Sequence, residues 1–599
     1  MWSFYTTNEI KPEGWLKRQL EIQAQSLSGN LHKVWRDVRD SAWIGGDAEG
    51  WERVPYWLDG FIPLAYLLDD EDMKATAARY VDAIVANQRE SGWICPCDEE
   101  NMKSYDTWAV QLISKVLVVY YECSHDEKIP GVIYKTMKNY YDLLKNGDIA
   151  LRGWGKARWF EAFVALKFLK DRYDEPWIAE LARILRSQGT DYASLTHLWK
   201  HPLNKWTFET HIVNLGMMLK YEAMCADVLG EEYTDKAEEL IEILNKYNGT
   251  PVGLFTGDEC LSGLSPIQGT ELCAVAEQMY SYELLFAHTG DDKWLRRLEL
   301  LAFNALPASI SDDMWTHQYV QMSNQIACVK FPGKSLFGTN GPESHLFGLE
   351  PNYGCCTANF NQAWPKLALS AFMHRDGEII SSLLIPASLN ADGISITLES
   401  SYPFKNECKY RINCNQDFTF TVKIPDFAKN ARIDGEEISG TIFSKTIPVG
   451  ECEISLSFDT SAELFESGCG LKYAKCGPLV FSLPIEYESS MIEYEKNGVE
   501  RKFPYCDYEY IPKSEFGYAY STDTIEVCHA EVSDIPFSSK NPPITLKASM
   551  YRIDWGYERG YDSVCARLPE SVEPISDKTE IHLYPYGCAK LRMTEMPII

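Results

Sequence analysis

Apolar residues follow two different spacings along the chain and divide it into two parts. Up to residue 373 they recur with the period of a helix in about twelve segments. Beyond residue 374 the period becomes two, as in Gly393–Leu398, Asp417–Ile424 and Cys452–Phe458. We therefore predict helices first and strands afterwards. The clearest helical segments are Pro55–Leu68, Met73–Asn87, Thr107–Glu122, Tyr134–Leu144, Lys156–Leu169, His211–Leu229, Thr234–Tyr247, Glu271–Phe286 and Asn359–Met373.

The connections between the expected helices alternate between short and long. Asp69–Asp72 and Gly290–Asp292 are short turns, whereas Ser41–Arg53 and Phe255–Thr270 are long loops. About twelve helices paired as hairpins predict an (α/α)6 barrel with a cleft at one end, although an open solenoid would show the same period. The expected fold class is multidomain α+β. We expect a helical barrel at 1–374, a β-sandwich at 375–470 and a second β-rich domain at 471–599.

The composition is that of a folded, acidic protein. Of 599 residues, 45% are hydrophobic and 24% are charged, and the net charge is −29. No Lys/Arg cluster offers the basic face that a nucleic-acid partner requires. No long apolar run predicts a membrane span, and the N-terminus lacks the pattern of a signal peptide. The 18 cysteines are scattered, unlike those of a small secreted domain. We therefore expect a cytoplasmic protein without nucleic-acid or membrane partners.

Two cysteine-containing motifs are the strongest candidates for chemistry. Cys355 and Cys356 are adjacent in PNYGCCTANFNQAWPK, and Glu271 and Cys273 stand two positions apart in QGTELC. Adjacent cysteines rarely form a disulfide with each other because the small ring is strained, but they can bind one metal ion. Three thiolates and one carboxylate suit tetrahedral Zn²⁺.

Both motifs are expected where helices begin. Residues two apart in the middle of a helix point about 200° apart, so Glu271 and Cys273 can share a ligand only at a helix start. The preceding Gly-Thr dipeptide is interpreted as the turn and N-cap of that helix, and the cysteine pair likewise precedes a predicted helix. Unpaired backbone N–H groups at a helix start favour anions, which predicts lowered thiol pKa values at both motifs.

Three interpretations of the cluster are open: a structural zinc that joins two helices, a zinc site in which one thiolate is also a nucleophile, and buried cysteines without a metal. A nucleophile needs a partner acid. Glu259, in GLFTGDECLSG on the long loop before Glu271, is the candidate. An enclosed carboxylic acid keeps a raised pKa and can protonate a leaving group. The alternative for Glu259 is a surface acid in a glycine-rich loop.

Aromatic residues in expected loops and helix starts are candidates for stacking on sugar rings. The polar run Trp51-Glu52-Arg53 and Asp59 either line the cleft or form ion pairs at helix ends. Core packing is the alternative for the aromatic candidates, which are Trp43, Trp51, Tyr56, Trp57, Trp93, Trp108, Trp154 and Trp159.

The motifs together resemble glycoside hydrolase family 127, the β-L-arabinofuranosidases, and its sister family 146. GTELCAVAEQM resembles the family's Glu-x-Cys-Ala helix start, and GCCTAN resembles its Cys-Cys-x-x-Asn motif. THIVNLGMMLKYEA resembles its Thr-His helix, and LELLAFNALPA its Glu-x-x-x-x-Asn segment. GPLVFSL and LYPYGCAKLRM resemble its β-domain signatures. The resemblance covers nearly the whole chain and implies a retaining mechanism with a cysteine nucleophile.

The resemblance also implies a role for each matching residue. Glu271, Cys273, Cys355 and Cys356 would bind Zn²⁺. Cys355 would attack the anomeric carbon and form a thioglycosyl intermediate. Glu259 would protonate the leaving oxygen and then activate water. Sugar contacts are implied for His211, Glu299 and Tyr319.

Differences from the family pattern concern the sugar pocket. Gln111 and Trp159 stand where characterised members have histidines, and Thr357-Ala358 replace two prolines after the cysteine pair. They affect the expected sugar more than the expected glycoside cleavage.

The leading hypothesis is a zinc-dependent retaining exo-glycosidase. We expect it to act on β-L-arabinofuranosides or a related pentofuranoside in short plant-type oligosaccharides. One alternative is a non-catalytic carbohydrate-binding protein with a structural zinc, and another is a barrel enzyme of different chemistry, such as a lyase. A β-sandwich surface is a candidate homodimer interface.

Overall fold

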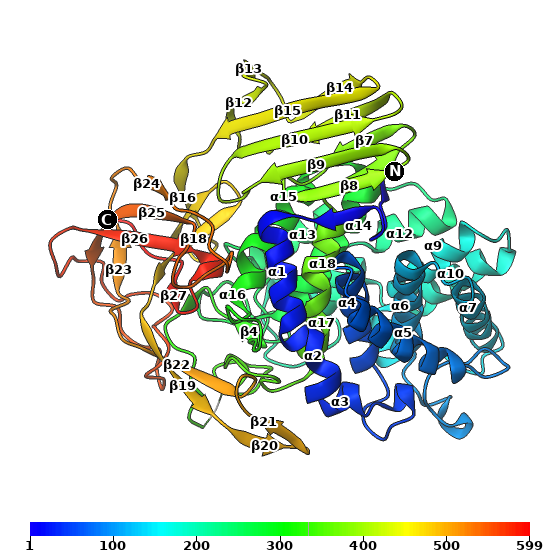
Figure 1. Ribbon diagram of the computed structural model, residues 1–599. Coiled ribbons are helices and arrows are strands. Elements are labelled where there is room, and N and C mark those ends of the chain that lie inside the picture. The colour runs from blue at the N-terminus through cyan, green and yellow to red at the C-terminus, as the bar shows by residue number, and fades with distance from the viewer. Residues whose placement is uncertain (334) are drawn as a thin grey trace.

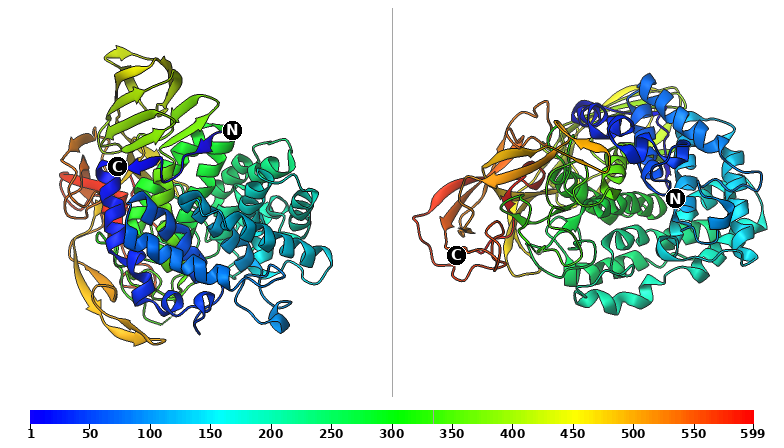
Figure 2. Two further views of the ribbon diagram at one scale, coloured as in Figure 1. Left: turned by 45° about the vertical axis from the view of Figure 1, so that its right-hand side comes forward. Right: turned by 90° about the horizontal axis from the view of Figure 1, so that it is seen from below.

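The computed structural model describes residues 1–333 and 335–599 and contains the helical and strand-rich parts that the apolar periods predict (Figure 1). Helices occupy the chain as far as Leu369, and strands dominate from Phe372 onward. Two further views show the strand-rich part gathered beside the helical domain (Figure 2). In the described part of the chain, no helix combines the length and the apolar character needed to span a membrane.

The helical domain has inner helices that are buried on nearly all sides and outer helices that are buried on one face. α4 (Arg53–Leu67) and α6 (Trp108–Ser124) are inner helices, since few of their residues reach solvent. α7 (Ile129–Lys145) and α10 (Pro176–Gln188) bury only a stripe of residues with helical spacing, as the outer helices of a barrel do. The other α-helices are α1 (Gly14–Gln25), α2 (Leu27–Val34), α3 (Arg36–Arg39), α5 (Glu71–Ala86), α8 (Gly153–Ala157), α9 (Ala162–Lys170), α11 (Ile212–Met218), α12 (Tyr221–Leu229), α13 (Lys236–Asn248), α14 (Leu272–Thr289), α15 (Asp292–Leu300), α16 (Leu306–Ala308), α17 (Cys355–Asn359) and α18 (Ala363–Leu369).

Several segments predicted as continuous helices are interrupted. Lys156–Leu169 is divided between α8 and α9, and His211–Leu229 between α11 and α12. Asn359–Met373 is divided among the end of α17, a 3-10 turn and α18, and Met373 already lies in a strand. The apolar spacing does not reveal these interruptions because buried residues continue through them.

Two facing sheets form the β-sandwich that follows the barrel. Their strand orders are β1-β6-β7-β11-β14 and β13-β12-β15-β10-β9-β8-β2. Between the sheets, Ser381 Oγ lies 2.9 Å from the Tyr410 hydroxyl, and the Tyr410 and Phe420 rings are 5.2 Å apart. The strands are β1 (Ser3–Phe4), β2 (Ile10–Pro12), β6 (Phe372–Arg375), β7 (Glu378–Ser381), β8 (Ala387–Ala391), β9 (Ile394–Ser400), β10 (Glu407–Cys414), β11 (Phe418–Lys423), β12 (Lys429–Ile433), β13 (Glu436–Glu437), β14 (Ile442–Ile447) and β15 (Gly450–Asp459).

The start of the chain belongs to this sandwich and not to the barrel. β1 pairs with β6, and β2 pairs with β8. Strands this short form only beside partners that are distant in sequence, so no local pattern reveals them. The helical domain therefore begins at α1 instead of at residue 1, and its expected end at residue 374 falls within β6.

The C-terminal sheet packs against the loops of the barrel. Its strand order is β16-β17-β18-β26-β25-β23, with β24 beside β25 and β27 beside β18. β27 (Arg592–Met593) also pairs with β5 (Asn324–Gln325), which lies in the long connection between α16 and α17. The buried Arg592 guanidinium donates to the Met322 carbonyl at 2.8 Å and so holds this connection in place. The remaining strands of this region are β16 (Ala462–Glu466), β17 (Lys472–Cys476), β18 (Leu479–Pro484), β19 (Tyr487–Ile492), β20 (Tyr494–Lys496), β21 (Val499–Arg501), β22 (Asp507–Pro512), β23 (Tyr518–Tyr520), β24 (Glu526–His529), β25 (Ile544–Arg552) and β26 (Thr579–Pro585).

Candidate active site

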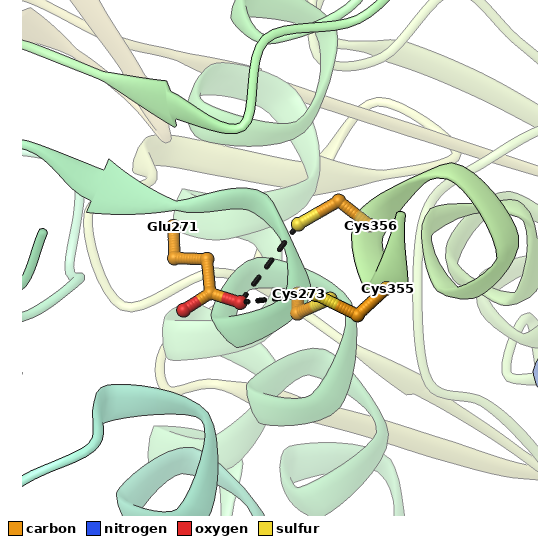
Figure 3. A group of neighbouring side chains, drawn as sticks. All are labelled: Glu271, Cys273, Cys355 and Cys356. Carbon is orange, nitrogen blue, oxygen red and sulfur yellow. Dashed lines mark hydrogen bonds between the residues drawn. The ribbon is translucent and has the colours of Figure 1, made fainter. Parts of the chain in front are cut away.

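Glu271, Cys273, Cys355 and Cys356 meet in one cluster, as predicted from the two motifs (Figure 3). One carboxylate oxygen and three sulfurs all lie within 4.8 Å of one another. Glu271 Oε1 is 3.9 Å from Cys355 Sγ and 3.8 Å from Cys356 Sγ. The buried Glu271 Oε2 has no hydrogen-bond partner among the described residues. Four donor atoms this close together could hold one metal ion.

A short pair of antiparallel strands positions the Glu271 carboxylate and Cys273. β3 (Thr270–Glu271) pairs with β4 (Val320–Gln321), and the Leu272 N–H donates to the Tyr319 carbonyl at 2.9 Å. α14 begins directly after β3 and carries Cys273 in its first turn. The cysteine pair opens α17, which packs against α14 and α4. Two helix starts that are distant in sequence thus bring together the four residues of the cluster.

The helix starts are shifted from their predicted places, and the thiol pKa values differ from the prediction. α14 is capped by Glu271 instead of the preceding threonine, and α17 begins at Cys355 itself. Hydrogen bonds from Cys273 and Cys356, aided by the charge of Arg53, hold the pKa of Cys355 well below its usual range. Burial raises the pKa of Cys273 and of Cys356. The predicted lowering is therefore wrong for these two thiols, because desolvation outweighs the helix-start effect.

Glu259 lies close to the cluster, on the loop between α13 and β3. Its carbonyl accepts a hydrogen bond from the Ile212 N–H at 2.8 Å. Glu259 Oε1 accepts from the Tyr319 hydroxyl at 3.0 Å, and Oε2 accepts from the indole N–H of Trp206. Burial, followed by the negative charge of Cys355, raises the pKa of Glu259 to about 7, although the two hydrogen bonds lower it. A carboxyl group that keeps its proton near neutral pH is suited to acid–base catalysis.

Asp258 fastens the loop on which Glu259 stands. Its buried carboxylate accepts hydrogen bonds from the backbone N–H groups of Gly269 and Gly338, both at 2.9 Å. The Asp258 carbonyl accepts from the side-chain amide of Asn340 at 2.5 Å. These bonds tie the loop of Glu259 to the start of β3 and to the long connection before α17.

Tyr319 connects the carboxyl group with the cluster. Its hydroxyl lies 3.0 Å from Glu259 Oε1 and 3.1 Å from Cys355 Sγ. Two groups that contact one hydroxyl are close enough to act on a single glycosidic bond. In retaining glycosidases the two catalytic groups stand about 5–5.5 Å apart, which this arrangement permits.

His211 also lies at the cluster. Its Nε2 is 3.7 Å from Glu271 Oε2, and its ring packs edge-on against Trp154 and Trp206. Burial lowers the pKa of His211 to about 3, so the ring is neutral around pH 7. Its buried Nδ1 has no hydrogen-bond partner in the part of the chain that the structure describes.

Arg158 is held near the site by two tryptophans. Its guanidinium lies 4.7 Å from the centre of the Trp108 ring and 4.3 Å from that of Trp154. Arg158 Nε donates to Asn214 Oδ1 at 2.8 Å, and its NH1 lies 3.6 Å from Glu52 Oε2. This buried network fixes the half-buried Trp154 ring that packs against the candidate histidine.

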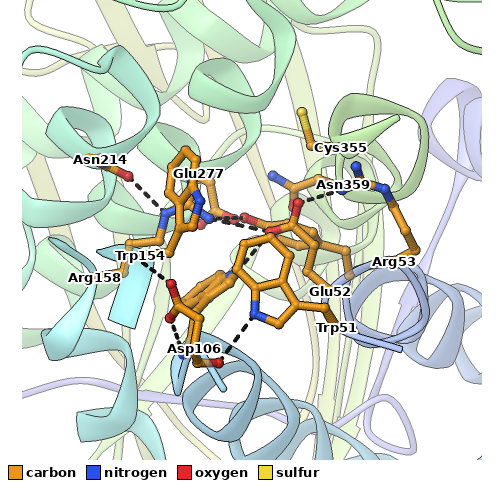
Figure 4. A network of polar contacts seen from close by, with 12 residues as sticks. Trp51, Glu52, Arg53, Asp106, Trp154, Arg158, Asn214, Glu277, Cys355 and Asn359 are labelled. Atoms are coloured by element: carbon orange, nitrogen blue, oxygen red, sulfur yellow. Dashed lines mark hydrogen bonds and ion pairs between the residues drawn. The ribbon is translucent and has the colours of Figure 1, made fainter. Parts of the chain in front are cut away.

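The run Trp51-Glu52-Arg53 forms the ion pairs that were one of the two interpretations considered from the sequence. Glu52 forms an ion pair with Arg53, and the positive charge of Arg53 acts on Cys355 (Figure 4). Trp51 donates its indole N–H to the Asp106 carbonyl at 3.3 Å. The run is therefore a network of ion pairs and hydrogen bonds that borders the cysteine cluster.

Two charged residues considered from the sequence have their contacts elsewhere. Asp59 is fully buried and forms ion pairs with buried lysines, among them Lys115 at 3.0 Å. Glu299, for which the resemblance implies a sugar contact, pairs with Arg296 at 2.5 Å and interacts with Tyr402 of the β-sandwich. The structure does not bring Glu299 to the cluster, because α15 directs it toward the interface with the sandwich.

The residues at the two expected histidine positions contact the scaffold. Gln111 donates to the Tyr140 hydroxyl at 3.1 Å and to the Gly155 carbonyl at 3.0 Å. Trp159 donates to the Thr190 carbonyl at 3.1 Å. Both side chains are buried and support neighbouring helices.

Most of the predicted stacking aromatics belong to the core, and two aromatic residues at the site were not predicted. Trp51 and Trp154 are half-buried, while the others are buried: Trp43, Tyr56, Trp57, Trp93, Trp108 and Trp159. Trp206 and Tyr353 are the additional residues. Trp206 stands in a polar loop shortly before His211, and Tyr353 stands directly before the Gly-Cys-Cys triplet. These neighbouring motifs are the sequence features from which both residues could have been predicted.

The chain is similar to known proteins in its structure. No protein-family model and no curated protein matches the sequence. A GH127 β-L-arabinofuranosidase from Geobacillus stearothermophilus T6 is similar with a TM-score of 0.69 and 15% identity, over 100% of both chains. A GH127 β-arabinofuranosidase has a TM-score of 0.70 and 14% identity, over 100% of this chain and 98% of the other. A glycoside hydrolase matches over the same shares with a TM-score of 0.69 and 13% identity. The predicted fold class is confirmed: the chain has the (α/α)6-barrel and β-sandwich fold of these GH127 structures.

Proposed function

We propose that this protein is a retaining glycoside hydrolase with Cys355 as its nucleophile and Glu259 as its acid–base residue. The observation that carries the proposal is the Tyr319 hydroxyl, which contacts the Glu259 carboxyl group at 3.0 Å and the Cys355 sulfur at 3.1 Å. The pKa of Glu259 is raised to about 7 and that of Cys355 is lowered, as a proton donor and a nucleophile require. The fold shared with GH127 arabinofuranosidases supports the same class of reaction.

We further propose β-L-arabinofuranosides, or a related pentofuranoside, as the substrate class. The enzyme would remove single sugars from the ends of short oligosaccharides. It would act in a reducing compartment such as the cytoplasm, because the cluster requires free thiols and every cysteine of the chain is free of disulfide bonds.

The proposed cofactor is one Zn²⁺ held by Glu271, Cys273, Cys355 and Cys356. When bound, it supplies the positive charge that keeps these ligands deprotonated and Cys355 oriented. Burial raises the pKa of Cys273, of Cys356 and of Glu271, so their charged forms together are unfavourable without a cation.

In the first step, the Cys355 thiolate attacks the anomeric carbon of the bound sugar. The carbon–sulfur bond forms while the bond from that carbon to the leaving oxygen breaks, and Glu259 transfers its proton to this oxygen. Tyr319 holds the carboxyl group and the sulfur in position. The neutral ring of His211 offers its free Nδ1 to a sugar hydroxyl.

In the second step, Glu259 acts as a base. Its carboxylate takes a proton from water, the water oxygen bonds to the anomeric carbon, and the carbon–sulfur bond breaks. Cys355 is a thiolate again and Glu259 is protonated, so the site returns to its starting state. Two displacements at one carbon retain the configuration of the sugar.

A panel of aryl glycosides that includes both arabinofuranose anomers tests this function, with the first-formed product anomer observed by NMR. We expect hydrolysis of the β-L-arabinofuranoside with retention, and a Glu259→Gln variant that is much slower. Inversion, or no turnover of any glycoside by zinc-loaded protein, would contradict the proposal. An unsaturated product that absorbs ultraviolet light would identify a lyase instead.

A further inference from the structure

The geometry points to Tyr353 as the platform of a leaving-group subsite that holds the sugar ring released in the first step, an inference that rests on the glycosidase function proposed above. Tyr353 comes two residues before Cys355, and 52% of its surface is exposed. Its ring centre lies 6.0 Å from that of the buried Tyr319, at an angle of 63°. An exposed aromatic ring thus packs against the tyrosine whose hydroxyl contacts both proposed reacting groups.

The position of the proton donor decides which part of a substrate reaches Tyr353. Glu259 has to lie beside the oxygen of the leaving group, whereas the attacked sugar lies over Cys355. Glu271 and Cys356 are almost completely buried, so the attacked sugar occupies the inner end of the site and the leaving group extends toward solvent. The Tyr353 ring stands at this outer end. A sugar ring has an apolar face of C–H groups and a polar edge, which an aromatic ring with a hydroxyl group complements.

The loop that carries Tyr353 is fixed from the C-terminal domain. Glu350, three residues earlier, forms an ion pair with Arg501 of β21, whose side chain is 1% exposed. On the other side of Tyr353, a Cβ atom at Gly354 would come within 2.5 Å of the Trp35 ring, so the backbone lies directly against this side chain. The exposed ring is therefore presented by an ordered loop, which reduces the entropy lost when a ligand stacks on it.

The same loop is linked to the loop of the proposed acid. The side-chain amide of Asn352 donates to Asn340 Oδ1, and the Asn340 amide donates to the Asp258 carbonyl at 2.5 Å. In sequence, Tyr353 directly follows Asn352, and Glu259 directly follows Asp258. The connection keeps the ring and the proton donor at a constant separation, as a subsite next to a general acid requires.

Two substrates that share one sugar but differ in the leaving group test the inference. One is a disaccharide with a terminal β-L-arabinofuranosyl residue, and the other is β-L-arabinofuranosyl fluoride, whose leaving group has no ring. In Tyr353→Ala, the ratio of kcat/KM for the disaccharide to kcat/KM for the fluoride is expected to fall about tenfold, the size of one aromatic stacking contact. Tyr353→Phe keeps the ring, so its ratio of the two kcat/KM values is expected to stay close to that of the wild-type enzyme.

Tyr557→Ala is the matched control, because Tyr557 is 56% exposed and lies in the C-terminal region. It is expected to leave the ratio unchanged, and melting temperatures show that all three variants fold. A normal ratio in Tyr353→Ala, with both substrates hydrolysed by the wild-type enzyme, would overturn this inference alone. If the wild-type enzyme hydrolyses neither substrate, the proposed function fails and the inference fails with it.

Discussion

Replacing Trp206 with phenylalanine removes one of the two hydrogen bonds to the Glu259 carboxyl group while keeping an aromatic ring. The indole N–H donates to Glu259 Oε2, and the Tyr319 hydroxyl donates to Oε1 at 3.0 Å. Both donors stabilise the charged carboxylate, so they lower a pKa that burial raises. Without the indole N–H, the pKa of Glu259 rises and its acid form persists to higher pH.

The size of this shift follows from the strength of the bond. A hydrogen bond to a charged group contributes about 1.5–3 kcal/mol, and one pKa unit corresponds to about 1.4 kcal/mol, so the pKa rises by about 1–2 units. Trp206 is only half-buried, and water can partly replace the lost donor, which favours the smaller value. From about 7 in the wild-type enzyme, the pKa of Glu259 then moves to about 8. At pH 8 the protonated fraction grows from about one tenth to about one half.

The pH dependence of kcat/KM for a glycoside with a poor leaving group measures this change, because it reports the pKa of the acid in the free enzyme. The alkaline limb of Trp206→Phe is expected about 1 pH unit above that of the wild type. Trp154→Phe is the control: its ring centre lies 5.5 Å from that of Trp206, but it does not donate to Glu259, so its limb keeps the wild-type position. An unshifted or downward-shifted limb in Trp206→Phe would refute the assignment of Glu259 as the proton donor.

Two further predictions concern stability and the metal. Asp59→Asn removes the carboxylate that pairs with the buried ammonium groups of both Lys115 and Lys366, and it lowers the unfolding free energy in a denaturant titration by about 3–5 kcal/mol. Asp47→Asn, which removes an exposed ion pair with Arg36, is the control and changes it by less than about 1 kcal/mol; equal effects would contradict the buried-network interpretation. A strong chelator is expected to abolish turnover and to lower the melting temperature. Elemental analysis is expected to find no bound zinc in Cys273→Ala. The control is Cys225→Ala, which replaces a buried cysteine of α12 and is expected to keep the zinc. Full activity and an unchanged melting temperature in zinc-free wild-type protein would argue against the metal site.

Much of the architecture could be predicted because the apolar period directly reflects burial. α4, α5, α6 and α14 lie within a few residues of their predicted segments, as do β9, β11 and β15. The cluster could be predicted because each motif is local and contains residue types that seldom occur together. One motif carries Glu271 and Cys273, and the other carries the adjacent cysteine pair. The two motifs come together because each lies at the start of a helix.

The remaining features depend on contacts between distant segments. β1 and β2 form only because β6 and β8 lie beside them. Trp206 reaches Glu259 because its loop folds over the start of α11, which neither loop's composition indicates. Glu299 matches a family segment in sequence, but its direction is set by the packing of α15 against the sandwich. The raised pKa values of Cys273 and Cys356 could not be predicted from their positions at helix starts, because they result from burial.

The central claim is that the Cys355 sulfur bonds to the sugar. Treating Glu259→Gln with an aryl β-L-arabinofuranoside that has a good leaving group tests this directly. The first step then needs no acid, but the second lacks its base, so the intermediate accumulates. Peptide mass mapping is predicted to find one pentosyl group on Cys355 and none on Cys273 or Cys356. Absence of an adduct during rapid release of the aryl group, or an adduct on another residue, would contradict the account.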